Sequence, residues 1–402
     1  MLADVQPAPP DPILGLTEAY RADTRPGKLN LGVGIYRDDH GRTPVLDAVR
    51  QAERVIVDTQ TTKDYLPIDG EPGYHRAVRD LLFGAERDAA LAGRARVCAS
   101  PGGSGGLRIV AEMIHFAFPD TRLWVPTPTW PNHPAIFAAA NLPTQTYRYF
   151  DPKRNGLDFD AMLDDLKQVP DGDTVLLHGC CHNPTGVDPS TDQWLALADV
   201  LANRPILPLI DRAYLGFGTG LEADAAGVYA ILDACPEAVV VMSFSKNFSL
   251  YRERVGAIVH VAESDTVATD VLSRIKQTVR RNYSNPPGHG AEVVRTILST
   301  PALRTQWLGE LDAMRSRINT TRSALTAGLD QRGVSLSADG NGFIGRQRGM
   351  FTLTGLTKDQ VHAIRQHHAI YAVDSGRINV AGITPDKLDA VCDAIADAVG
   401  AA

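Results

Sequence analysis

The chain has 402 residues, more than one ordinary hydrophobic core accommodates, so we expect two domains. Its hydrophobic fraction of 44% and charged fraction of 22% are ordinary for a globular protein, and its net charge of -7 argues against nucleic acid as a partner. No apolar run approaches the length of a membrane span, the N-terminus lacks the pattern of a targeting peptide, and five cysteines are too few for a disulfide framework. We therefore expect a cytoplasmic protein with no nucleic-acid or membrane partner.

The first two thirds of the chain show the pattern of an α/β protein. Residues 1–12 are rich in proline and are predicted to form an extended arm, which would fray or pack on a neighbour. The stretch 29–38, LNLGVGIYRD, indicates a short strand interrupted by Gly32 and Gly34. From about residue 48 to 300 helical stretches alternate with apolar strands, the clearest being 122–125, 174–177, 207–210 and 239–241. This alternation predicts a parallel sheet with crossover helices.

The pattern changes after residue 300. A long amphipathic helix comes first, followed by two strand-like segments at 350–356 and 377–382. The last helix has Thr384 as its expected N-cap and Pro385 in its first turn. We interpret this part as a second, smaller α+β domain, joined to the first by the long helix.

The loop after the strand at 239–241 contains a lysine that is flanked by polar residues and followed by an arginine. Lys246 lies between Ser245 and Asn247, close to Ser243, with Arg254 a few residues on. Ligands of open α/β sheets bind in loops at strand ends, where a lysine can lose its proton and form a Schiff base with a carbonyl. An isolated lysine is far more often a solvated surface residue, so the interpretation depends on the other strand ends.

Two further strand ends carry features that suit a flat, anionic ligand. The segment 101–106, PGGSGG, precedes a helical stretch, and its backbone N–H groups at Gly103 and Ser104 could bind a phosphate. Its glycine spacing does not match a dinucleotide or P-loop fingerprint, and a plain tight turn explains it equally well. Trp130 follows another strand and could stack on a planar ring, although a core position is the simpler explanation.

The segment 176–186, LLHGCCHNPTG, offers a possible metal site that we do not favour. Cys180, Cys181 and His182 are potential ligands, but side chains of adjacent residues are expected to point apart, and no second ligand pair has zinc spacing. We therefore expect no metal. Asn183 opens the turn NPTG and is expected to present its amide to the strand-end cleft.

Charged residues are the last group of candidate functional residues. Asp211 ends a buried strand and Tyr214 follows it; the carboxylate could cap a loop or keep a pyridine nitrogen protonated. Arg377 lies beside a strand of the small domain, and a guanidinium is the natural bidentate partner of a carboxylate. Arg280 and its neighbour Arg281 could bind an acidic group or remain solvated. Together with the lysine, the glycine segment and the tryptophan, these residues indicate pyridoxal 5′-phosphate as a cofactor.

The motifs are specific enough to suggest a family. The chain resembles the class I aminotransferases of the aspartate and aromatic amino acid subgroup, which are pyridoxal-phosphate enzymes of fold type I. The likeness covers essentially the whole chain and is carried by LNLGVGIY, YLPIDGEPGY, HGCCHNPTG, DRAYLGF, SFSKNFSLYRERVG, NYSNPPGHG, RGMFTLTGL and SGRINVAG.

The resemblance implies the following architecture. The fold would be α/β, with a large domain whose mostly parallel sheet is sandwiched by helices and a smaller α+β domain. The arm would comprise 1–12, the large cofactor-binding domain 48–300, and the small domain 301–402 with a contribution from 13–47. Two copies would form a homodimer with shared active sites.

The resemblance also implies a role for each site residue. The catalytic residues would be Lys246, which binds the cofactor and moves the substrate proton, Asp211, which pairs with the pyridine nitrogen, and Tyr214. His133 would support Asp211. The cofactor would further be held by Gly103, Ser104, Trp130, Asn183, Ser243, Ser245, Arg254 and the partner's Tyr65, and the substrate by Gly34, Trp130, Asn183, Arg377 and the partner's Arg280.

The implied reaction is ping-pong transamination of L-aspartate, aromatic L-amino acids or both with 2-oxoglutarate, which gives the 2-oxo acid and L-glutamate. The alternatives are a C–S lyase or β-decarboxylase on the same scaffold, a non-catalytic sensor that binds the cofactor, and a nucleotide-dependent α/β enzyme. The specificity signals are mixed. Ser104 and Ser249 resemble the aromatic enzymes, whereas Asp64, Thr43 and Asn285 resemble the aspartate enzymes.

One residue departs from the family pattern. Arg212 stands between Asp211 and Tyr214, where an apolar or small residue is usual. We expect its side chain to face away from the site, because a guanidinium inside the site would compete for Asp211.

Overall fold

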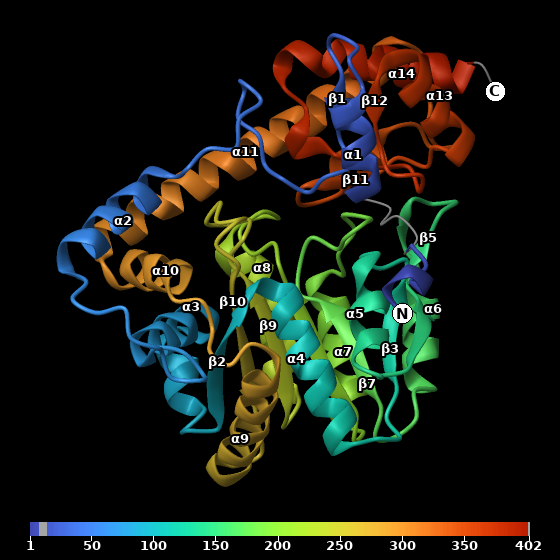
Figure 1. Cartoon of the computed structure of the whole chain (residues 1–402). Coiled ribbons are helices and arrows are strands. Elements are labelled where there is room, and N and C mark those ends of the chain that lie inside the picture. Colours follow the sequence, from blue (N-terminus) through green and yellow to red (C-terminus); the bar gives the residue numbers. More distant parts are fainter. Residues whose placement is uncertain (8–13, 401–402) are drawn as a thin grey trace.

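The computed structural model describes residues 1–7 and 14–400 (Figure 1). Residues 8–12 of the predicted arm lie outside the described residues; residues 1–7 are exposed and contain a single 3-10 turn at Leu2–Asp4. The helices are α1 (Leu14–Ala22), α2 (Asp47–Thr59), α3 (Pro72–Ala90), α4 (Gly102–Ala117), α5 (Asn132–Ala139), α6 (Phe159–Lys167), α7 (Thr191–Ala202), α8 (Leu221–Ala234), α9 (Asp265–Asn282), α10 (His289–Ser299), α11 (Pro301–Gln331), α12 (Gly342–Arg346), α13 (Lys358–His368) and α14 (Leu388–Gly400). The strands are β1 (Leu29–Asn30), β2 (Ala95–Pro101), β3 (Leu123–Thr127), β4 (Thr144–Arg148), β5 (Phe150–Asp151), β6 (Gly156–Leu157), β7 (Thr174–His178), β8 (Leu207–Arg212), β9 (Ala238–Ser243), β10 (Val255–Val261), β11 (Phe351–Leu353), β12 (Ile370–Tyr371) and β13 (Arg377–Asn379).

A seven-stranded sheet forms the centre of the larger part of the molecule. Its strand order is β2-β10-β9-β8-β7-β3-β4. The pairs from β9 to β4 are parallel, whereas β10 runs antiparallel to both of its neighbours. The carboxyl ends of β9, β8, β7 and β3 therefore lie at one edge, together with the start of β10.

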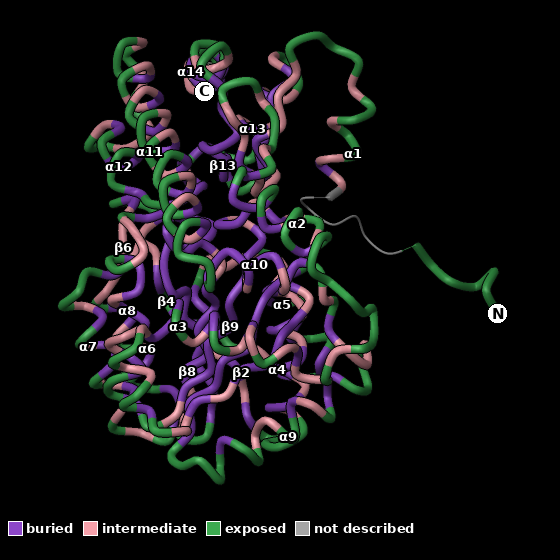
Figure 2. Tube along the Cα trace, turned by 90° about the vertical axis from the view of Figure 1, so that its left-hand side faces the viewer, coloured by how far each residue is buried: buried purple, intermediate pink, exposed green. Residues whose placement is uncertain are grey.

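Helices cover both faces of this sheet, because alternate residues of each strand point to opposite sides. On β9, Val239 and Val241 pack with α4, α5 and α9, whereas Val240 and Met242 pack with residues of α3, α7, α8 and α10. Both faces are buried, which explains why the strands read as apolar runs without alternation. Figure 2 shows the buried residues concentrated along these strands.

A smaller group of elements lies at the strand-end edge of the sheet (Figure 1). It contains α1, α13, α14 and the short pairs β1–β12 and β11–β13, and it has a hydrophobic core of its own. The 31-residue α11 belongs to both cores: Trp307 and Ile318 pack with the large sheet, and Leu325 and Leu329 pack with the small core. This helix therefore connects the two parts.

The predicted elements agree with the structure in type. The four strands named from the sequence are β3, β7, β8 and β9, and the crossover helix α7 between β7 and β8 is capped by Ser190 through a capping box with Gln193. The α/β class and the mostly parallel sheet are confirmed. Thr384 occupies the predicted N-cap position with Pro385 next to it, but the helix begins with a 3-10 turn at Pro385–Lys387 that leads into α14. The Thr384 side chain makes no cap hydrogen bond, and its hydroxyl donates to the Asp386 side chain.

No helix within residues 1–7 and 14–400 is both long enough and apolar enough to cross a membrane.

Candidate active site

A cavity of about 550 Å³ opens at the carboxyl ends of the parallel strands. This is the edge at which open α/β sheets bind ligands. Of the predicted site residues, all but His133, Tyr65 and Arg280 line it. They are Gly34, Gly103, Ser104, Trp130, Asn183, Asp211, Tyr214, Ser243, Ser245, Lys246, Arg254 and Arg377.

Lys246 enters the cavity three residues after β9 ends at Ser243. Its side chain is half-buried, and Nζ lies 4.9 Å from the ring centroid of Tyr214. Removal from water lowers the pKa of the ammonium to about 8; Asp211 acts in the opposite sense, and the positive charge of Arg254 adds to the lowering. Lys246 can therefore supply a neutral, nucleophilic amine near physiological pH.

Asp211 is the end of a chain of hydrogen bonds. Its Oδ2 is 3.1 Å from Nε2 of His133, Nδ1 of His133 is 2.8 Å from the Thr129 hydroxyl, and that hydroxyl is 3.1 Å from Nε2 of His178. At the other end the backbone N–H of Asn183 donates to Nδ1 of His178 over 3.4 Å. A backbone donor at one end and a carboxylate acceptor at the other fix the direction of every bond, so both imidazoles carry their proton on Nε2.

This chain sets the charge of the site. Burial opposes ionisation of Asp211, yet the hydrogen bond from His133 and nearby positive charge keep the pKa of its carboxyl below the usual value. Burial lowers the pKa of His178 to about 3, so its imidazole stays neutral. Asp211 is therefore a permanent anion with a fixed orientation, able to bind a protonated ring nitrogen.

An anion cradle lies beside Lys246. The helix α4 begins at Gly102, and Gly103 and Ser104 of its first turn face the cavity. Nη1 of Arg254 donates to the Ser245 hydroxyl over 3.2 Å, and the Ser243 hydroxyl is 3.2 Å from the same oxygen. Hydroxyls, a guanidinium and the positive end of a helix dipole together suit a phosphate.

The glycine backbone of this cradle leaves no room for side chains. Gly102 has a φ of +69°, and a Cβ there would lie 2.7 Å from Nη2 of Arg254. A Cβ on Gly103 would lie 3.2 Å from Cβ of Ser243. The glycines therefore allow the helix N-terminus to approach Ser243 and Arg254.

Arg377 forms the opposite wall. Its guanidinium is 2% exposed and donates through Nη1 to Oδ1 of Asn183 over 3.0 Å and through Nη2 to the Gly32 carbonyl over 2.6 Å. The Phe351 ring lies 4.2 Å beneath it, and a Cβ on Gly34 would lie 2.6 Å from that ring. Nε of Arg377 is buried without a partner. Burial lowers the pKa of Arg377 only to about 10, so the guanidinium remains charged and available to a carboxylate.

Tyr65 and Arg280 lie outside this cavity. Tyr65 is 93% exposed and lines a separate surface pocket with Lys63 and Asp64. Arg280 is exposed at the end of α9, where it hydrogen-bonds to Ser284. Within a single chain neither side chain contributes to the cavity.

Arg212 is buried on the far side of its strand. Asp211 lines the cavity and Arg212 does not, because successive strand residues point to opposite faces. The Arg212 side chain is 1% exposed, and none of its three nitrogens has a hydrogen-bond partner. Burial lowers the pKa of this guanidinium.

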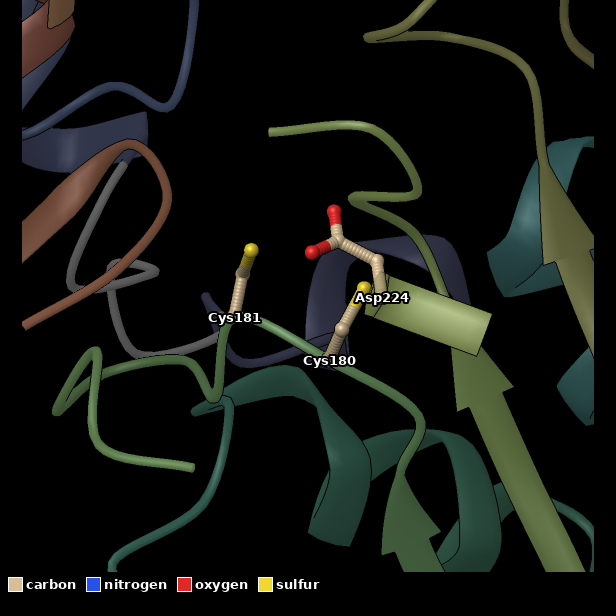
Figure 3. A group of neighbouring side chains, drawn as sticks. All are labelled: Cys180, Cys181 and Asp224. Carbon is tan, nitrogen blue, oxygen red and sulfur yellow. The ribbon is translucent and has the colours of Figure 1, made fainter. Parts of the chain in front are cut away.

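The prediction that the side chains of Cys180 and Cys181 point apart is wrong. Their sulfur atoms and a carboxylate oxygen of Asp224 all lie within 4.8 Å of one another (Figure 3). Cys181 has a φ of +52°, in the left-handed region, and this turns its side chain to the same side as that of Cys180. Such a backbone conformation is rare for a residue other than glycine, so no residue pattern predicted it.

Sequence reasoning missed His178, Thr129 and Phe351 as members of the site. His178 is the last residue of β7, and its position at a strand end was a usable signal. Thr129 and Phe351 have ordinary polar and apolar side chains, and only their three-dimensional neighbours distinguish them.

The sequence matches the family described as "Aminotransferase class I and II" over residues 26–395. The chain belongs to this family. It is 47% identical over 395 residues to the aspartate aminotransferase of Escherichia coli K12, covering 98% of this chain and 99% of the relative. It is 45% identical over 394 residues to the aromatic-amino-acid aminotransferase of Pseudomonas aeruginosa, covering 98% of each.

Solved structures of such aminotransferases share the fold. One is the aromatic-amino-acid aminotransferase of Burkholderia pseudomallei, covalently bound to pyridoxal phosphate, with a TM-score of 0.95, 44% identity and 99% coverage of both chains. Another is the cytoplasmic aspartate aminotransferase of Saccharomyces cerevisiae, with a TM-score of 0.96, 35% identity, and coverage of 100% of this chain and 98% of that one. The resemblance to class I aminotransferases and the predicted fold type are therefore confirmed, and this chain is an aminotransferase.

Proposed function

We propose that this aminotransferase uses pyridoxal phosphate to transfer the amino group of L-aspartate and of aromatic L-amino acids to 2-oxoglutarate. One observation carries the proposal. A nucleophilic lysine, a fixed carboxylate, an anion cradle and a buried arginine line a single cavity. Relatives of both specificities, at 47% and 45% identity, support both classes of substrate.

The donor set fits the cofactor. Its phosphate would be held by the anion cradle, which consists of Gly103, Ser104, Ser243, Ser245 and Arg254. Asp211 would bind the ring nitrogen, and Tyr214 and Asn183 would hydrogen-bond the ring oxygen. Trp130 would stack on the face of the ring. The bare backbone at Gly102, where a Cβ would collide with Arg254, fits the close approach of a phosphate. When bound to Lys246, pyridoxal phosphate supplies an electron-withdrawing ring that stabilises negative charge at the substrate Cα.

The protein's own residues perform the proton transfer and the positioning. Nζ of Lys246, with a pKa of about 8, is a base of suitable strength to take the Cα proton of the amino acid. Asp211 stays ionised because His133 donates to it, and it would keep the ring nitrogen of a bound cofactor protonated. Arg377 would bind the α-carboxylate through Nε and the outward edge of its guanidinium, since Asn183 and Gly32 already accept from the two terminal nitrogens.

We further propose that a second copy of the chain completes the site. Tyr65 is a large aromatic residue with 93% of its surface exposed, so its ring and hydroxyl are available to a partner subunit. Arg280 is exposed and has no carboxylate at ion-pair distance within the described residues. In a homodimer Tyr65 of the partner subunit would reach the cofactor phosphate, and Arg280 of the partner subunit would bind the distal carboxylate of aspartate or move aside for an aromatic ring.

We also propose that residues 48–300 form the large domain and that 13–47 together with 301–402 form the small one. The separate hydrophobic core of the smaller group supports this division. A cytoplasmic location is supported by five free, buried cysteines, because cytosolic reductants keep thiols reduced.

Two half-reactions test the proposed function. Purified holoenzyme is mixed with aspartate, or separately with phenylalanine, and the cofactor absorbance and the 2-oxo acid are measured. We expect conversion with both amino acids. Conversion with aspartate alone would restrict the enzyme to dicarboxylates, and formation of alanine and carbon dioxide from aspartate in place of the 2-oxo acid would indicate β-decarboxylation.

A further inference from the structure

Three potential metal ligands converge at a buried point behind the cavity wall. Cys180 and Cys181 follow β7, and Asp224 lies in the first turn of α8. Their exposed fractions are 6%, 2% and 7%. One ligand atom from each lies within 4.8 Å of the other two, and Figure 3 shows both sulfurs directed to the same side as the carboxylate. Small movements of these side chains would bring all three to bonding distance of one ion.

The backbone holds the two thiols in this arrangement. The left-handed conformation of Cys181 is fixed by Asp188, whose carboxylate accepts from the backbone N–H of Cys181 over 2.7 Å and from that of His182 over 2.8 Å. The convergence therefore does not depend on a bound ion.

The carboxylate is oriented by the loop before α8. Oδ2 of Asp224 accepts from the N–H groups of Gly216 and Gly218, both over 2.9 Å, and Oδ1 accepts from the N–H of Thr219 over 2.7 Å. Oδ1 thus has one hydrogen bond and a free lone pair. Metal-binding carboxylates are oriented by hydrogen bonds of this kind.

The charges of the cluster suit a divalent cation. Arg212 is fully buried beside Cys180 and Asp224 without a hydrogen bond, and its positive charge offsets the negative charge of the carboxylate. Two thiols that bind a divalent cation release two protons, so the net charge of the cluster would not change. Burying a charged group destabilises a protein mainly when no opposite charge lies nearby, and here Arg212 and Asp224 carry opposite charges.

We propose that Cys180, Cys181 and Asp224 form a binding site for a zinc-class divalent cation, with two thiolates and one carboxylate oxygen as ligands. Sulfur ligands select soft and borderline ions, and three protein ligands leave one position of a tetrahedral zinc for water. Because Cys180 also lines the catalytic cavity, the ion and its water would enter from that side. The site is distinct from the proposed chemistry at Lys246 and does not depend on it.

The test is zinc binding to chelator-treated holoenzyme, measured by dialysis with metal analysis and by competition with a chromophoric chelator. We expect one zinc per chain, and an X-ray absorption spectrum with two sulfur neighbours at about 2.3 Å and oxygen at about 2.0 Å. Cys181→Ser should weaken binding by more than about 100-fold, beyond the usual effect of losing a group that only orients a ligand. Cys235→Ser is the matched control, since that thiol is also buried but lies outside the cluster, and it should bind zinc like the wild type.

A second variant keeps the test independent of the thiols. Asp224→Asn, checked for folding by circular dichroism, should weaken zinc binding and leave the two sulfur neighbours in the spectrum. The proposal is overturned if the wild type retains no zinc, if Cys181→Ser binds it as tightly as Cys235→Ser, or if the spectrum contains no sulfur.

Discussion

Two buried arginines allow a direct comparison of a guanidinium with and without hydrogen-bond acceptors. Arg212 and Arg322 are each 1% exposed. Arg212 has no partner, whereas Arg322 donates to the carbonyls of Ile344, Gly349 and Phe351 and to the Thr352 hydroxyl. The same change to methionine, which keeps most of the aliphatic volume, should therefore destabilise the protein much more at Arg322 than at Arg212.

The magnitudes follow from what each substitution leaves behind. Arg212→Met removes a desolvated guanidinium that has no hydrogen bond, but it also takes away the positive charge beside Asp224, so the two effects oppose each other and we expect the free energy of unfolding to change by no more than about 1 kcal/mol. Arg322→Met leaves three carbonyls and a hydroxyl to find new partners, and we expect it to lower that free energy by about 3–5 kcal/mol.

Urea denaturation of the holoenzymes at one protein and cofactor concentration measures both effects. Fluorescence and circular dichroism should report the same midpoint, and the slope should match that of the wild type before the midpoints are compared. Destabilisation by Arg212→Met of the same size as that by Arg322→Met would refute the reasoning, because it would mean that Arg212 has acceptors in the folded protein.

Four further outcomes are expected. Lys246→Ala should abolish turnover and still bind the cofactor without a covalent bond, as seen by absorbance after dialysis; near-normal turnover would remove Lys246 from the mechanism. Arg377→Leu should lower kcat/KM for aspartate and phenylalanine alike, by about 100-fold or more if a charge-assisted pair worth about 3 kcal/mol is lost. Arg280→Leu should lower kcat/KM for aspartate far more than for phenylalanine, and equal losses would place Arg280 away from the substrate. Apoenzyme should take up pyridoxal phosphate faster as pH rises, with a half-maximal rate near pH about 8 and a plateau above it, since only the neutral amine of Lys246 attacks the aldehyde; a rate that does not change with pH would contradict the lowered pKa.

The sequence allowed the strand ends to be predicted because two simple patterns coincide there. Buried parallel strands read as apolar runs, and the polar residue that ends each run faces the ligand edge; Asp211 and Ser243 follow this rule. The same reasoning could not predict contacts between segments that are far apart in the sequence. Arg377 meets the Gly32 carbonyl 345 residues away, and no local pattern records that pairing.

The predictions at the two cysteines and at Thr384 departed from the structure for local reasons. The side chains of Cys180 and Cys181 were expected to diverge because extended chains alternate, but the left-handed residue after β7 cancels the alternation at this one place. Thr384 was placed at the N-cap from its residue type, and the structure has it there, but its hydroxyl donates to the Asp386 side chain and accepts no hydrogen bond from the helix backbone. A residue type thus predicted the position of the cap and not its hydrogen bond.

Asn183 shows why a single residue type is needed where the two parts of the site meet. Its Oδ1 accepts from Arg377 at 3.0 Å, and its Nδ2 lies 3.5 Å from the Tyr214 hydroxyl, to which it donates. An aspartate could accept from the arginine but could not donate to the phenol, and it would also neutralise the charge meant for a substrate carboxylate. A leucine would leave the buried guanidinium without one of its acceptors. Only an amide can accept a hydrogen bond from Arg377 on one side and donate one to Tyr214 on the other without neutralising the charge of Arg377.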